Sequence, residues 1–116
     1  MAKYHGSCHC GAVAYDVELE LTNLLACNCS ICGRSGSILS FVQPSAFTLL
    51  KGQDMLTDYL FNKHLIHHQF CKVCGIKSFA RGSDGKGNEM VAVNVRCLDG
   101  VDANTLEPQK YDGRSL

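Results

Sequence analysis

The feature that most constrains this chain is the arrangement of its cysteines. The sequence has eight cysteines in 116 residues, and seven of them fall into three short motifs. These are Cys8-His9-Cys10-Gly11, Cys27-Asn28-Cys29-Ser30-Ile31-Cys32-Gly33 and Cys71-Lys72-Val73-Cys74-Gly75. Thiols one or two residues apart can hold one metal ion from a single turn, so this spacing favours metal binding over disulfides.

Composition and charge narrow the class of protein. Apolar residues make up 46% of the chain and charged residues 19%, which is typical of a globular domain. Eleven basic residues balance eleven acidic ones without a basic block, so we expect neither nucleic acid nor a membrane as a partner. The first residues have no apolar signal-peptide core, which predicts a cytoplasmic protein with reduced thiols. The length predicts one domain over residues 1–116, with a peripheral tail from about residue 103 to residue 116.

The hydrophobic pattern predicts a mainly β protein. Between residues 12 and 21, Val13, Tyr15, Val17 and Leu19 alternate with polar side chains, as in a half-buried strand. One helical turn is expected at residues 30–34, a loop at 82–88 and a loose tail at 111–116. Further strands are expected at residues 4–7, 37–42, 56–61, 65–70, 76–80 and 90–95.

The first and third motifs predict a closed, structural zinc site. Cys8, Cys10, Cys71 and Cys74 supply the four thiolates that zinc takes in a tetrahedron. The glycine after each pair permits a positive φ angle, which aims backbone N–H groups at the sulfurs. The alternatives are buried apolar cysteines or a redox-active Cys-x-x-Cys pair.

The second motif predicts an open site. Cys27, Cys29 and Cys32 supply three thiolates within six residues, and three protein ligands with a free fourth position are typical of catalytic zinc. Three thiolates make zinc a weak Lewis acid, which favours a thiol as the exchanging ligand. Two alternatives stay open: a metal-free thiol cluster, or a second closed site whose fourth ligand is one of Cys97, His64, His67, His68 and His5.

The three motifs together resemble the glutathione-dependent formaldehyde-activating enzyme family, which also includes centromere protein V. The matching segments are residues 6–11, 27–32 and 70–75, together with the late segment 93–99, and the resemblance spans about residues 4–102. One position departs from many members, because Asn28 stands where they carry histidine between the first two cysteines of the second motif.

The resemblance implies a β-tent fold of stacked antiparallel sheets stapled by a structural zinc. It implies two zinc ions per chain, a structural one on Cys8, Cys10, Cys71 and Cys74 and a catalytic one on Cys27, Cys29 and Cys32. It further implies a carbon–sulfur lyase activity that joins glutathione and formaldehyde reversibly in S-hydroxymethylglutathione, so a small thiol is the expected partner. For a glutathione carboxylate the sequence offers four basic residues, Lys51, Lys63, Lys77 and Arg81.

Three functions are therefore considered. The favoured one is a zinc-dependent, carbon–sulfur lyase-like enzyme acting on a small thiol and aldehyde adduct. The second is a non-catalytic, zinc-stabilised binding module. The third is a thiol oxidoreductase of the methionine sulfoxide reductase type, which requires a reactive cysteine off the metal, and only Cys97 is left for that role.

Overall fold

The protein is mainly β, as the sequence pattern predicts. A computed structural model describes residues 2–60, 66–83 and 87–111, with ten strands and one short α-helix in these ranges. The helix is α1 (Cys32–Ser35), and four 3₁₀ turns lie at η1 (Pro44–Ala46), η2 (Gln53–Met55), η3 (Val95–Cys97) and η4 (Ala103–Thr105).

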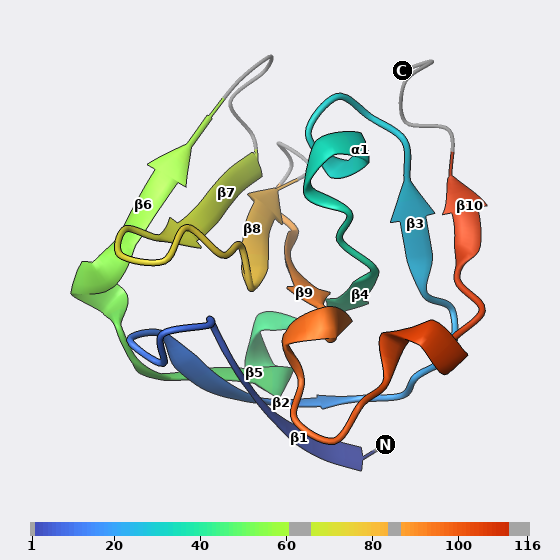
Figure 1. The fold of residues 1–116 in the computed structure, drawn as a ribbon, viewed down its shortest axis with the longest axis horizontal. Helices are drawn as coiled ribbons and strands as arrows, with labels where there is room; N and C mark the ends of the chain where they lie inside the picture. Colours follow the sequence, from blue (N-terminus) through green and yellow to red (C-terminus); the bar gives the residue numbers. More distant parts are fainter. Residues whose placement is uncertain (1, 61–65, 84–86, 112–116) are drawn as a thin grey trace.

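The strands form two sheets. A three-stranded antiparallel sheet has the order β1 (Ala2–Ser7), β2 (Ala14–Leu19), β5 (Phe47–Lys51). The larger sheet has the order β10 (Gln109–Tyr111), β3 (Leu25–Cys27), β4 (Leu39–Val42), β9 (Glu89–Asn94), β8 (Phe79–Ser83), β7 (Ile66–Cys71), β6 (Leu56–Tyr59). In Figure 1 its two arms splay apart above the smaller sheet, and α1 lies between them at the far end. This is the layered, stacked-sheet architecture that the resemblance implies.

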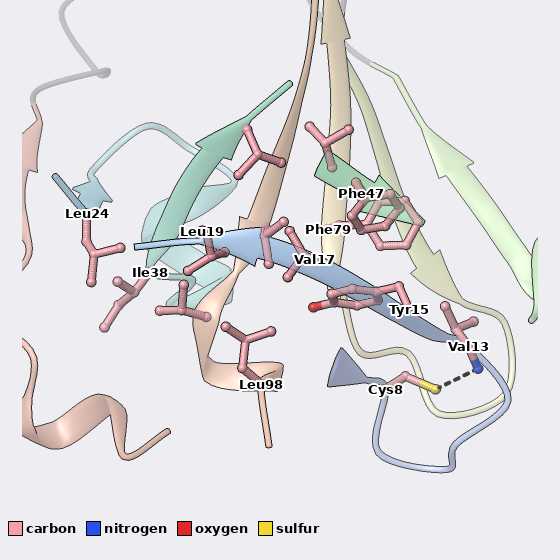
Figure 2. Packing of buried hydrophobic residues seen from close by; sticks show 14 of the residues in the cluster. Cys8, Val13, Tyr15, Val17, Leu19, Leu24, Ile38, Phe47, Phe79 and Leu98 are labelled. Atoms are coloured by element: carbon pink, nitrogen blue, oxygen red, sulfur yellow. Dashed lines mark hydrogen bonds between the residues drawn. The ribbon is translucent and has the colours of Figure 1, made fainter. Parts of the chain in front are cut away.

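The alternating pattern of the second predicted strand places β2 at the centre of the core. Val13, Tyr15, Val17 and Leu19 are buried, whereas Glu18 is exposed, because successive side chains of a strand point to opposite faces. Strand β2 pairs with β1 on one side and β5 on the other, so its buried face is presented to the larger sheet (Figure 2).

Three aromatic rings join the two sheets. Tyr15 lies 4.9 Å from Phe47 and 5.7 Å from Phe79, and the two phenylalanine rings are 4.8 Å apart between centroids. The Tyr15 hydroxyl donates to the Ser78 carbonyl at 3.2 Å, so this buried polar group has an acceptor. Each aromatic pair contributes about 0.5–1.5 kcal/mol beyond the area it buries, which fixes β2 and β5 against β8.

Two predicted elements differ from the structure. Strand β8 begins at Phe79 and continues to Ser83, although residues 76–80 were expected as the strand and 82–88 as a loop. The reason is that the Ile76 carbonyl accepts from the Cys71 N–H at 3.1 Å, which holds this segment in the cysteine turn. Tyr111 was expected in a loose tail, but it ends β10, which pairs in parallel with β3. The rest of the expected tail, residues 112–116, lies outside the described residues.

Candidate metal-binding and active sites

The first and third motifs meet in a four-cysteine cluster, defined as Cys8, Cys10, Cys71 and Cys74. Their sulfur atoms all lie within 4.8 Å of one another, although the two pairs are about sixty residues apart in sequence. Cys10 Sγ lies 3.7 Å from Cys8 Sγ and 3.6 Å from Cys71 Sγ. A tetrahedron with metal–sulfur bonds of 2.3 Å has edges of about 3.8 Å, so these four thiols fit a zinc-sized ion.

Two similar turns build this cluster. Gly11 and Gly75 have φ angles of 81° and 79°, as predicted from their place after each cysteine pair. The N–H of Gly75 donates to the Cys71 carbonyl at 2.8 Å, which closes the second turn. Backbone N–H groups then point at the sulfurs: Val13 N–H donates to Cys8 at 3.4 Å, and Val73 N–H donates to Cys71 at 3.4 Å. Such donors stabilise thiolate ligands.

The thiols of the four-cysteine cluster differ in pKa. The pKa of Cys74 falls to about 6: burial opposes this, but backbone N–H groups and the neighbouring thiols donate to its sulfur. The Ala12 N–H favours ionisation of Cys10, yet the pKa of Cys10 rises to about 11 because desolvation and hydrogen bonds with the other thiols favour its neutral form. A bound cation would favour the thiolate form of all four ligands.

The second motif forms a three-cysteine cluster, defined as Cys27, Cys29 and Cys32. Its sulfurs also lie within 4.8 Å of one another, and among the described residues no further Cys, His, Asp or Glu joins them at that spacing. Strand β3 ends at Cys27, and the chain then turns into α1, where the Gly33 N–H donates to the Cys29 carbonyl at 2.8 Å. Gly36 ends the helix in the left-handed conformation at φ 70°. Cys32 is buried and the other two thiols are half-buried.

The local structure separates the pKa values of these thiols. Partial burial opposes ionisation of Cys29, but N–H groups of Cys32 and Ile31 and two neighbouring thiols donate to its sulfur and lower its pKa. Desolvation raises the pKa of Cys32 to about 12, and its hydrogen bond to Cys29 acts in the same direction. The neighbouring Lys77 ammonium opposes that rise.

Lys77, which precedes β8, lies beside this cluster, and His68 of β7 interacts with the Lys77 charge. Burial lowers the pKa of Lys77, whereas the three sulfurs of the three-cysteine cluster favour its charged form. His68 is buried, and desolvation, together with the Lys77 charge, lowers its pKa to about 4, so His68 is neutral at pH 7. The three-cysteine cluster therefore has one cation beside it that offsets part of the charge of three thiolates.

A hollow of about 240 Å³ lies beside the segment that joins Cys29 to Cys32. Ser30 and Ile31, which lie between two of the cysteines, line it together with Arg34 and Tyr59. One guanidinium nitrogen of Arg34 donates to the carbonyl of Ser30, which precedes α1, at 2.8 Å. The remaining N–H groups of this exposed guanidinium suit a planar anion such as a carboxylate.

The residues weighed as a fourth ligand are placed elsewhere. His5 and His67 are exposed and hydrogen-bonded to Asp16 and Asp58, each at 3.0 Å. His68 points to the opposite face of β7 from His67, as their adjacent positions predict. The three-cysteine cluster therefore includes neither these three histidines nor Cys97. His64 lies outside the described residues.

Cys97 lies at the end of η3, half-buried and outside both clusters. Burial raises its pKa to about 11, and the nearby Cys8 and Cys74 sulfurs raise it further. A thiol with this pKa is almost entirely protonated near neutral pH, which makes it a poor nucleophile.

Of the basic residues offered for a carboxylate, only Lys77 lies beside the three-cysteine cluster. Lys51 is exposed at the end of β5, Arg81 packs on core aromatic rings, and Lys63 lies outside the described residues. Arg34 and Tyr59 were not predicted. Arg34 had a signal, because it lies one helical turn after Ser30, but Tyr59 reaches the hollow only through the folding of the larger sheet.

The fold and the two clusters define a small β protein with two cysteine sites that could hold metal ions. Of the helices that the structure describes, none has the length and apolar character needed to cross a bilayer. The family described as glutathione-dependent formaldehyde-activating enzyme matches residues 3–112, and the chain belongs to this family. A crystal structure of a Rhodobacter sphaeroides protein, a structural-genomics target, is similar with a TM-score of 0.82. It is 34% identical over 92% of this chain and 99% of its own.

Proposed function

We propose that this protein is a zinc-dependent enzyme of the carbon–sulfur lyase class that acts on a small thiol and aldehyde adduct. The family suggests glutathione and formaldehyde as the pair that forms S-hydroxymethylglutathione. The observation that carries the proposal is the difference between the two clusters, since one brings four sulfurs together and the other three. The first suits a structural zinc ion, and the second suits a zinc ion that also binds a substrate atom.

Zinc in the three-cysteine cluster would lower the pKa of a substrate thiol and polarise an aldehyde carbonyl. In the addition, the thiol sulfur forms a bond to the carbonyl carbon. The π electron pair moves to oxygen, and the proton lost by the thiol ends on that oxygen. The reverse reaction breaks the same carbon–sulfur bond, so no oxidant or reductant is required.

The chain's own residues supply charge and orientation. The Lys77 ammonium lies where it offsets the negative charge of three thiolates and an arriving substrate thiolate. Arg34, in the nearby hollow, is placed to hold a substrate carboxylate, while its bond to Ser30 keeps the guanidinium fixed. Holding thiol and aldehyde side by side lowers the entropic part of the barrier.

The proposal is tested by measuring exchange between formaldehyde and its glutathione adduct with the zinc-loaded protein. Because thiols add formaldehyde without an enzyme, the rate is compared with buffer alone and with Cys29→Ser. The matched control is Cys97→Ser, which removes a thiol outside both clusters. Acceleration by wild type and Cys97→Ser, but not by Cys29→Ser, is the expected result. Equal rates in all four samples would reject the enzyme and leave the binding module.

The oxidoreductase alternative makes a different prediction. It needs Cys97 as the reactive thiol, and the raised pKa of this half-buried residue opposes that role. Methionine sulfoxide turnover that is lost in Cys97→Ser and kept in Cys29→Ser would support the oxidoreductase instead.

A further inference from the structure

A second hollow, of about 320 Å³, is lined by residues of β6, β7, β8 and β9. These strands are neighbours in the larger sheet (Figure 1). The polar lining of the hollow comes from Asp58, His67, Gln69, Arg81 and Glu89. Strand register puts these side chains on one face, since Asp58 is paired with Gln69 and His67 with Arg81. They come from four strands of one sheet, which gives the hollow a rigid floor.

Arg81 is the cationic side of this hollow. Its guanidinium carbon lies 5.3 Å from the Phe47 ring centroid and 5.5 Å from that of Phe79, so buried rings hold it in place. In the part of the chain that the structure describes, no carboxylate forms an ion pair with it. A half-buried guanidinium that is stacked on aromatic rings keeps its N–H edges for a planar anion.

Asp58 is the anionic side. Its two carboxylate oxygens accept from His67 at 3.0 Å and from the Gln69 amide at 2.8 Å. Hydrogen bonds from Gln69 and His67 lower the pKa of Asp58, so it stays charged near neutral pH. Each oxygen retains a lone pair for another donor. Gln69 is only 9% exposed, so its amide holds the Asp58 carboxylate from within the sheet.

This hollow is separate from the three-cysteine cluster. His67 and Gln69 point to one face of β7, whereas His68, which interacts with the Lys77 charge beside that cluster, points to the other. A molecule in the hollow therefore does not share the site proposed for the thiol.

From the two fixed charges of opposite sign, we infer that this hollow binds a small zwitterion with the head group of an α-amino acid. Its carboxylate lies on the Arg81 guanidinium, and its ammonium lies on the Asp58 carboxylate, two strands away in the same sheet. The net charge of the polar lining disfavours a simple anion, because two carboxylates surround one guanidinium.

The test uses L-alanine as the probe, with propionate and ethylamine as analogues of similar size that carry only one of the two charges. Each is titrated into the zinc-loaded, isotope-labelled full chain, and backbone amide shifts are followed by NMR. Saturable shifts confined to β6–β9 with L-alanine, and binding about tenfold or more weaker for both analogues, are expected. Equal binding of propionate, no saturable shifts, or shifts only around the three-cysteine cluster would overturn the inference.

Two variants locate the site. Arg81→Lys keeps the charge but loses the two-pronged geometry, and Asp58→Asn removes the anion at an exposed strand position. Each is expected to weaken L-alanine binding about tenfold or more, while Arg96→Lys, on η3, binds as the wild type does. Spectral dispersion reports folding, so Asp58→Asn decides the question if Arg81→Lys is unfolded. Unchanged binding in folded Asp58→Asn would overturn the inference.

Discussion

Replacing Cys71 by serine should destabilise the zinc-loaded protein far more than replacing Cys29, although each change removes one thiol from a cysteine cluster. Cys71 is buried, and its sulfur lies 3.6 Å from that of Cys10, which is 61 residues earlier in the chain. A metal ion held by both therefore closes a loop of that length. The three-cysteine cluster lies within six residues and closes no long loop.

The size of the effect follows from loop entropy. A cross-link across about 61 residues removes about 14 cal/mol/K from the unfolded chain, or about 4 kcal/mol at 25 °C. We therefore expect Cys71→Ser to lose about 4 kcal/mol in its free energy of unfolding. By the same expression Cys29→Ser should lose only about 1–2 kcal/mol, because its links span only two or three residues.

Urea unfolding of the zinc-loaded proteins, with zinc content measured in parallel, provides the assay. Cys97→Ser is the control, since this half-buried thiol lies outside both clusters. Both cluster variants should lose one zinc ion per chain, but only Cys71→Ser should shift the midpoint strongly. A Cys71→Ser protein that keeps full zinc and unfolds like the wild type would refute the structural site. Equal losses of unfolding free energy in both cluster variants would show that loop length does not set the size of the effect.

Three further outcomes are expected. Gly6→Ala should cost about 2–3 kcal/mol of unfolding free energy, because its Cβ would lie 2.5 Å from the buried Tyr15 ring, whereas Gly82→Ala, with its nearest neighbour at 3.5 Å, should be near neutral in the same urea assay. Lys77→Met should weaken zinc binding at the three-cysteine cluster on the order of tenfold in a chelator competition, and Lys77→Arg should retain the wild-type affinity. Equal zinc affinity in the two variants would show that the charge at this position does not stabilise the thiolates. His68 has a pKa of about 4 when folded and 6.5 when unfolded, so the unfolded chain binds the extra proton and stability falls as pH drops through that window. Relative to His68→Gln, the wild type should lose about 2 kcal/mol of unfolding free energy between about pH 7.5 and pH 5. If the unfolding free energies of the two proteins depend on pH in the same way, His68 does not titrate as expected.

Local patterns anticipated much of the fold. Alternation from Val13 to Leu19 identified β2, because the side chains of a strand buried on one face repeat every two residues. Glycines after the cysteine pairs anticipated the two turns with positive φ, since that conformation strains residues with a Cβ atom. The predicted start of β8 was wrong because the Ile76 carbonyl accepts from the N–H of Cys71, five residues earlier, which keeps Ile76 in the cysteine turn.

The environment of the candidate site was harder to anticipate. Lys77 was one of four basic residues offered for a carboxylate, and nothing in the sequence distinguished it from Lys51. The structure places Lys77 beside the three-cysteine cluster and Lys51 at the exposed end of β5. Burial and distance decide the role of a charge, and both depend on which strands become neighbours.

By itself, the sequence determined which thiols are neighbours within each motif. Spacings of one and two residues place thiols within reach of one metal ion wherever the rest of the chain goes, because the backbone between them is too short to separate them. Tertiary structure alone decided which pairs would meet, which cations would lie beside them and how Asp58 and Arg81 would face one hollow. These contacts join segments that are far apart in the chain. They form only when burial of the core side chains brings the strands into register.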